Sequence, residues 1–123
     1  MRKLTIEIWG RVFELVVTYD CYDGEEVLPE QKAALNQFLS QDELIDTVKG
    51  DVEAYCVSHS NGKIDKVDNI FKYVIPTTLY IPRETNKRSV ALLCNFFFDP
   101  EHDMAIVFEN EALKEIGAQD IVL

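Results

Sequence analysis

Residues 90–98, VALLCNFFF, are apolar at almost every position, and a second run with strand character, MAIVFE, follows at residues 104–109. Apart from Asn95, both alternating faces of the first run are apolar, which predicts a central strand covered on both sides. The second run has the two-residue period of a strand. The five residues between the runs, DPEHD, have the composition of a turn. The C-terminal third therefore predicts two paired antiparallel strands.

The N-terminus predicts another hairpin. Residues 4–8 and 13–19 alternate between apolar and polar side chains, which is the period of half-buried strands. Gly10 lies between them and tolerates positive φ, which favours a type II′ turn over residues 9–12 with the glycine at the first central position. The tryptophan of this turn and the aromatic run at residues 96–98 are expected to pack inside the covered sheet rather than line a pocket.

Two helices are predicted after the first hairpin. The first begins at Pro29, which suits the first turn of a helix, and an apolar stripe follows. Ser40 and Glu43 have the spacing of a capping box, which predicts that a second helix begins there. The apolar positions of this helix follow a 3.6-residue period through Cys56. Gly50 falls inside it and indicates a kink or a close packing contact.

The remaining strand signals complete a sheet. Residues 78–81 are β-prone but bounded by Pro76 and Pro82, which predicts an edge strand. Residues 112–116 predict a last short strand. We therefore expect an α+β fold, with an antiparallel sheet formed by the N-terminal hairpin, a central segment and the C-terminal hairpin, and a pair of helices packed on one face. The length fits a single domain over residues 1–123.

Composition excludes several classes of protein. The chain has 22 acidic residues and 12 Lys plus Arg, which gives a formal net charge of −10. Because phosphate binding requires clustered cations, no nucleic-acid partner is expected. No membrane partner is expected either, since no apolar run approaches the roughly 20 residues of a membrane-spanning helix. Three widely spaced cysteines, Cys21, Cys56 and Cys94, form no CxxC pair and indicate reduced thiols in the cytoplasm.

The thiols are not predicted to be catalytic. Cys56 lies on the apolar stripe of the second helix and Cys94 lies in the central strand, so both are expected in the core. Cys21 is expected to be the exposed thiol, without a basic neighbour to activate it. A catalytic pair of Cys94 with His102 is excluded by distance. Five strand residues, at about 3.3 Å each, separate the two side chains along the strand, which is far beyond the reach of a hydrogen bond.

The turn between the C-terminal strands holds the side chains best suited to chemistry. Asp99, Glu101, His102 and Asp103 place three carboxylates and an imidazole within five residues. Carboxylate and imidazole suit zinc, manganese or iron, so a small metal-dependent or hydrolytic enzyme is the alternative hypothesis. Neighbouring side chains of a tight turn point in different directions, which favours structural roles instead. No cofactor is predicted, since the sequence has none of the common nucleotide, metalloprotease or calcium motifs.

The preferred hypothesis is binding rather than catalysis. Residues 20–60 carry ten acidic residues against two lysines. The stripe at Leu44, Val48 and Val52 must face the sheet, so the acids of the second helix face solvent. Such a face complements a basic protein partner, whereas the competing interpretation is an acidic surface that only confers solubility. The predicted partner-binding residues are the acids of both helices: Glu30, Asp42, Glu43, Asp46, Asp51 and Glu53.

Cys94 is followed by an aromatic residue, by the run Asp-Pro-Glu-His at residues 99–102, and by an alternating strand that ends at Asn110. This combination resembles an uncharacterised bacterial domain family. Related domains occur among toxin–immunity loci, so the resemblance implies an immunity-like or regulatory binding role. Asp103 and Glu111 stand where that family has glycine, at positions where positive φ is expected. The resemblance therefore implies that these two turns are rebuilt here.

Overall fold

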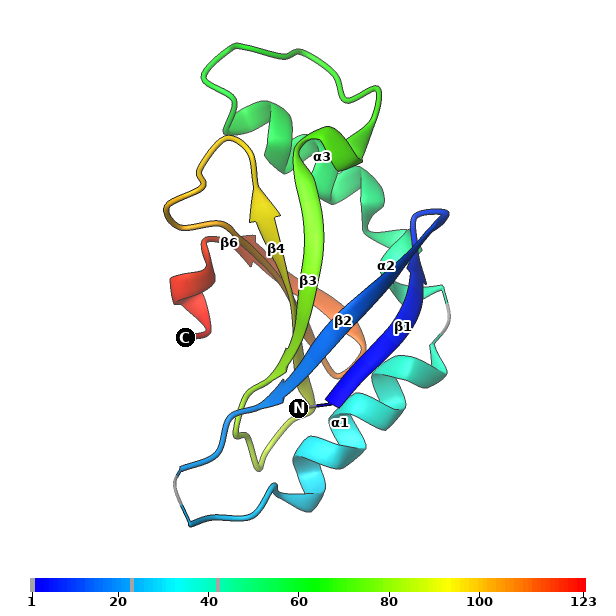
Figure 1. The fold of residues 1–123 in the computed structure, drawn as a ribbon, viewed down its shortest axis with the longest axis vertical. Helices are drawn as coiled ribbons and strands as arrows, with labels where there is room; N and C mark the ends of the chain where they lie inside the picture. Colours follow the sequence, from blue (N-terminus) through cyan, green and yellow to red (C-terminus); the bar gives the residue numbers. More distant parts are fainter. Residues whose placement is uncertain (1, 23, 42) are drawn as a thin grey trace.

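The computed structural model describes residues 2–22, 24–41 and 43–123 (Figure 1). Six strands form one sheet whose strand order follows the chain. The elements are β1 Arg2–Ile8, β2 Arg11–Tyr19, α1 Pro29–Ser40, α2 Leu44–Thr47, α3 Lys49–Ser58, β3 Val74–Ile81, β4 Ser89–Phe96, β5 Met104–Glu109 and β6 Ala112–Gly117, with short 3₁₀ turns η1 Ile70–Lys72 and η2 Gln119–Ile121.

The sheet is antiparallel except at one junction. β1 and β2 form a hairpin, and β3 to β6 form an antiparallel meander. β3 joins β2 in parallel, after the helices have crossed between the two strands. The predicted α+β class is confirmed. The two strands of the C-terminal third are confirmed as well, since β4 pairs antiparallel with β5 from Ser89 opposite Glu109 to Cys94 opposite Met104.

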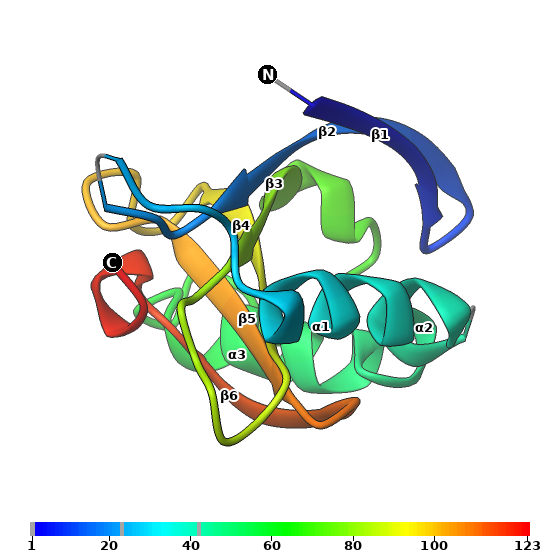
Figure 2. The same cartoon turned by 90° about the horizontal axis from the view of Figure 1, so that it is seen from below.

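The helices cover one face of the sheet, which curls around them. Figure 2 shows α1 and α2 on the concave side, between the β1–β2 hairpin and the β5–β6 hairpin. Apolar side chains of both layers form the main core, in which Phe38 of α1 meets Phe108 of β5 with 5.1 Å between ring centroids. A smaller cluster with Val122 packed against it lies apart from this core and comes from β4 and β5: Ala91, Leu93, Ala105 and Val107. β4 is therefore buried on both faces, as its apolar pattern predicted.

Residues 78–81 belong to a central strand, so the prediction of an edge strand is wrong. β3 lies between β2 and β4. The register of β3 against β4 shifts between Pro76 and Thr78, and the pairing of β3 with β2 begins only at Thr78. Proline has no N–H to donate, so it fits where the ladder of hydrogen bonds is interrupted.

The second predicted helix is two shorter helices. The helical run breaks at Val48, between α2 and α3. The predicted capping box is wrong, because Ser40 ends α1 and its hydroxyl donates to the carbonyl of Gln37 at 2.7 Å. Gly50 lies beyond the break, and a Cβ there would meet open space. This glycine therefore marks neither the kink nor a close contact.

The N-terminal turn lies one residue earlier than predicted. Ile8 pairs with Arg11, so the loop consists of Trp9 and Gly10 alone. Both have positive φ, 51° and 83°, which is the pattern of a type I′ turn, and the predicted type II′ turn is wrong. Positive φ costs a residue with a side chain roughly 1–2 kcal/mol. Tertiary contacts of Trp9 must therefore hold this conformation.

Two further turns adopt positive φ without glycine. Asp103 has φ of 54° and Glu111 has φ of 61°. The Asp103 carboxylate accepts a hydrogen bond from the N–H of Phe96 at 3.0 Å. Both carboxylate oxygens of Glu111 accept from the guanidinium of Arg88, each at 2.8 Å. These side-chain bonds offset the backbone cost that glycine would avoid.

Candidate protein-binding surface

The α2–α3 segment carries most of the acids predicted to bind a partner. Glu43 directly precedes α2, and Asp46 lies within it; both are exposed. Asp51 is exposed in the first turn of α3, and Glu53 is half-buried on the same helix. Four of the predicted residues therefore share one stretch of helical surface.

Glu30 belongs to a different part of the surface. It lies in the first turn of α1 and lines a separate hollow together with Lys87 and Arg88. Figure 1 shows that α1 begins at the end of the molecule away from α3. Asp42, which was also predicted to bind the partner, lies outside the described residues.

A groove opens between β1 and the junction of α1 with α2, and we call it the β1–α2 groove. Its volume is about 540 Å³. Its apolar lining comes from both layers of the fold: Leu4, Ile6, Phe38, Leu39 and Ile45. Two exposed acids, Glu43 and Asp46, line it from the helical side. Glu7 lines it from β1, where alternation with the buried Ile8 directs its carboxylate to the other face of the sheet. An apolar hollow with a few placed charges is the usual form of a binding site.

Glu7 is the residue of this groove that the sequence did not reveal. It lies on β1, far along the chain from the helices, and only the folded topology makes it part of the same groove as Glu43 and Asp46. The alternation of Glu7 with Ile6 and Ile8 predicted that it lies on a strand of the N-terminal hairpin. Nothing in that pattern indicates which helix the hairpin packs beside.

The acids that line the groove have no ion-pair partner among the residues that the structure describes. Within the described ranges, Glu7, Glu43 and Asp46 form no ion pair, whereas Glu109 and Glu111 each pair with lysine or arginine. Carboxylates that share one groove repel one another, and a cation supplied from outside would relieve this repulsion. The groove is therefore electrostatically suited to a basic ligand.

Trp9 fixes the N-terminal hairpin against α2. Its indole Nε1 donates a buried hydrogen bond to the carbonyl of Ile45 at 3.0 Å. Its ring packs against Phe71, with 6.1 Å between the centroids. Ile45 also lines the groove, so the same contact helps to set the separation of β1 from α2. The groove is thus part of the packed fold.

The polar turn after β4 brings two of its four candidate ligands into contact. Nδ1 of His102 lies 3.1 and 3.2 Å from the two carboxylate oxygens of Asp99. Asp103 instead accepts from the backbone of Phe96, and Glu101 is exposed. Among the residues that the structure describes, no three His, Cys, Asp or Glu side chains gather in a way that would hold a metal ion.

We expect Asp99→Asn to lower the pKa of His102. Asp99 raises that pKa above the ordinary value of 6.5, by accepting a hydrogen bond from the ring and by its charge. The folded protein therefore favours the imidazolium, so this contribution to stability is present below the unfolded pKa and is lost as the pH rises through the folded pKa. NMR titration of the ring protons measures the shift, and His102→Gln assigns the resonance. An unchanged pKa in Asp99→Asn would contradict the pairing.

The cysteines differ in their surroundings. Cys56 and Cys94 are fully buried, as predicted, and burial raises the pKa of the Cys56 thiol to about 11 and also raises the pKa of Cys94. Cys21 is partly exposed. The guanidinium of Arg83 lies 3.7 Å from its sulfur, so the prediction of no basic neighbour is wrong. Arg83 reaches this thiol from a distant loop and also pairs with Glu25 at 2.7 Å.

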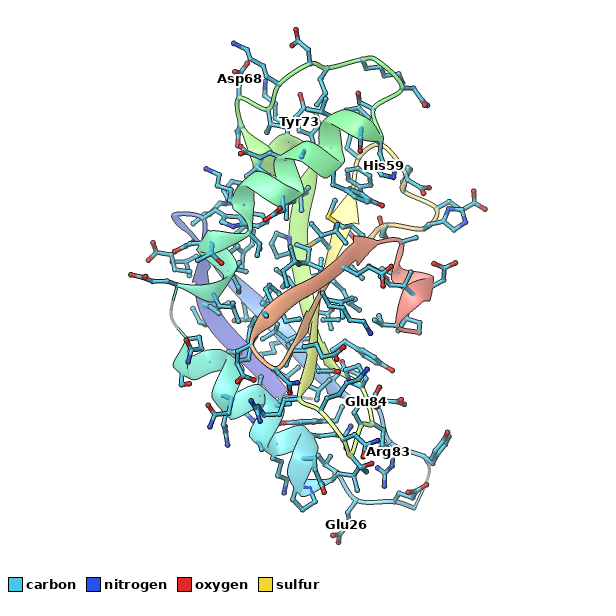
Figure 3. The ribbon with its side chains drawn as sticks, turned by 180° about the vertical axis from the view of Figure 1, so that it is seen from behind. Glu26, His59, Asp68, Tyr73, Arg83 and Glu84 are labelled. Carbon is cyan, nitrogen blue, oxygen red and sulfur yellow. The ribbon has the colours of Figure 1, made fainter. Side chains whose placement is uncertain are left out.

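An aromatic patch lies at the end of the molecule opposite Arg83. Phe96 and Trp9 are buried, as predicted, but Phe97 is 65% exposed, so the prediction is wrong for this residue. Phe97 is the first residue after β4, where the alternation of the strand no longer directs its side chain. It packs against Tyr73 at 6.2 Å between centroids and lines a shallow hollow of about 400 Å³. Figure 3 shows Tyr73 far from Arg83.

These features define an α+β protein in which a curled six-stranded sheet and a helical layer frame an acidic groove. The chain belongs to the family described as Domain of unknown function (DUF6985), whose model matches residues 1–123. This match confirms the resemblance to an uncharacterised domain family. No curated protein and no solved structure matches the chain. Within the described ranges, no helix is both long enough and apolar enough to cross a membrane.

Proposed function

We propose that this protein is a binding module rather than an enzyme, and that its β1–α2 groove docks a basic segment of a protein partner. The observation that carries the proposal is a pair of exposed acids, Glu43 and Asp46, that line an apolar groove and form no ion pair within the described chain. Lysine or arginine side chains of the partner would pair with these carboxylates while apolar side chains enter the groove.

The rest of the acidic surface supports the same proposal. Asp51 lies in the first turn of α3, directly beyond the groove-lining α2, and Glu53 follows on the same helix. These residues extend the negative potential that attracts a basic partner during encounter. The resemblance to domains of toxin–immunity loci adds support for an immunity-like or regulatory role, in which the partner is a protein whose activity the binding controls.

The partner can be captured from the groove itself. A photo-crosslinking amino acid at Gln41, which is exposed and lines the groove, joins the module to the protein that occupies it in the native host. With the purified partner, we expect the association rate to fall as salt rises, because exposed charges are screened over about 8 Å at physiological ionic strength. Glu43→Lys combined with Asp46→Lys is expected to lower the rate about tenfold at low salt.

A matched control separates the groove from net charge. Glu30→Lys combined with Asp120→Lys makes the same change in net charge at two exposed acids that do not line the groove, and it is expected to slow association much less. Equal slowing by both double variants would show that only overall charge matters. An association rate that neither salt nor the groove variant changes would refute the proposed docking surface.

A further inference from the structure

β1 is an edge strand of the sheet. It pairs with β2 over its whole length, from Arg2 to Ile8, without a bulge, and no strand lies on its other side. The opposite edge, β6, carries Lys114 and Glu115, and its pairing with β5 shifts register. Charged side chains and bulges are the usual protection of exposed edges against pairing with another chain. β1 also carries charged side chains, Arg2, Lys3 and Glu7, but unlike β6 it has no bulge. Figure 2 shows it as the last strand of the curled sheet.

The register of the hairpin fixes which backbone groups of β1 are free. Ile8 and Arg11 flank a two-residue turn, so they are a hydrogen-bonded pair. Hydrogen-bonded and non-hydrogen-bonded pairs alternate along an antiparallel ladder. Lys3, Thr5 and Glu7 therefore direct their N–H and C=O groups away from β2, toward the open edge. The β1–α2 groove runs along part of this same edge, residues 4–7.

We infer that β1 pairs antiparallel with β1 of a second copy of this chain, centred on Thr5. In that register Lys3 lies opposite Glu7 of the second copy, and Leu4 lies opposite Ile6 of the second copy. Each strand has its cations at its start and its acid at its end, so antiparallel pairing matches opposite charges at both ends. Parallel pairing in register would place Lys3 against Lys3 and Glu7 against Glu7.

The groove strengthens the same pairing. Glu43 and Asp46 line the groove beside β1, on the face opposite the Glu7 side chain, so the acidic end of β1 has negative charge on both of its faces. The basic start of the second strand, with Arg2 and Lys3, meets this end in the antiparallel register. The free backbone supplies the hydrogen bonds, and these charges select the orientation. The pairing does not depend on the proposed basic partner.

Sedimentation velocity of the purified chain tests this inference. Between about 5 μM and about 500 μM we expect a concentration-dependent shift from monomer to dimer, since an interface this small gives weak association. Thr5→Pro removes the central outward N–H while the bonds of β1 to β2 stay intact, and it is expected to raise the dissociation constant at least about tenfold. Thr5→Val keeps that N–H and is the matched control, with dimer formation retained.

Charge exchange gives a second test that does not involve proline. Lys3 is also paired with Glu14 of β2 at 3.2 Å, so the series is made in a Glu14→Gln background. There Lys3→Glu and Glu7→Lys each place like charges opposite one another and are expected to weaken the dimer, whereas the double variant restores the pairs and the dimer. Circular dichroism confirms that each variant is folded. If Thr5→Pro does not fold, the charge variants by themselves test whether β1 forms the dimer. A monomer at every concentration, a dimer indifferent to Thr5→Pro, or a double variant as weak as the single ones would overturn the inference. The second copy and the proposed basic partner would meet the same acids, Glu43 and Asp46, so the two interactions would compete. Because no partner protein is present in these experiments, their results report on the dimer alone.

Discussion

Trp9→Ala is expected to lower the free energy of unfolding by about 3–5 kcal/mol, the range typical of a large buried aromatic residue truncated to alanine. Trp9 is only 9% exposed, and its loss removes both the contact with Phe71 and the hydrogen bond to Ile45. Trp9→Phe keeps the apolar ring and loses the hydrogen bond, which contributes about 1 kcal/mol net, because the Ile45 carbonyl still accepts from Val48. Urea denaturation followed by circular dichroism measures both changes.

A glycine variant distinguishes packing from backbone strain at this position. Trp9→Gly loses the same contacts as Trp9→Ala but relieves the positive φ, so we expect it to be more stable than the alanine variant by about 1 kcal/mol. In ordinary strand positions the order is the reverse. Val12→Ala, at a 63% exposed position of the same hairpin, serves as the control and is expected to stay within about 0.5 kcal/mol of the parent. Alanine equal to or better than glycine would argue against a strained Trp9.

Gln31→Leu is expected to lower the free energy of unfolding by about 3 kcal/mol, although it makes the core more apolar. The Gln31 side chain is 1% exposed, and it joins three separate segments. Its Nε2 donates to the carbonyls of Asp20 and Ile81 at 2.9 and 3.1 Å, and its Oε1 accepts from the N–H of Leu28 at 2.9 Å. Three hydrogen bonds at about 1 kcal/mol each are lost, and buried backbone groups lose partners.

Two further variants define the cause of this loss. Gln37→Leu changes an exposed glutamine on the same helix and is expected to leave stability within about 0.5 kcal/mol. Gln31→Glu keeps the acceptor for Leu28 but sets a buried carboxylate against two carbonyls, so we expect a loss that lessens at low pH, where the introduced carboxyl is protonated. Thermal melts at neutral and acidic pH measure both. A stable Gln31→Leu protein would show that the three bonds contribute little.

Local pattern was sufficient for most of the strands and for the first helix. The apolar run of β4 and the alternation of β5 predicted that these two strands pair. A strand face that is buried requires apolar residues, so burial can be seen directly in the sequence. The N-terminal hairpin was predictable for the same reason, although its exact loop was not. Trp9 occupies a turn position that normally takes glycine or asparagine, and the contacts that hold it there come from distant segments.

Long-range partners were not predictable from the sequence. Pro76 indicated an edge because a proline lacks the N–H of a central strand, but its place at a register shift depends on where β4 runs. The acidic surface was predicted from the spacing of the α2 stripe. Its groove was not, since only the folded topology brings β1 beside the junction of α1 with α2. Arg83 beside Cys21 and Gln31 between three segments are contacts of the same kind.

The single parallel junction of the sheet has a consequence for how the chain folds. β3 to β6 pair only with neighbours in sequence, so this meander can form through short loop closures. β2 and β3 pair only from Val16 opposite Thr78 to Tyr19 opposite Ile81. All the helices lie between these two strands in the sequence. Non-local pairing of this kind is slow, because the entropy of closing the loop is lost before the contacts repay it. We therefore expect the N-terminal hairpin to dock late, so that the surface between β1 and α2 is completed near the end of folding.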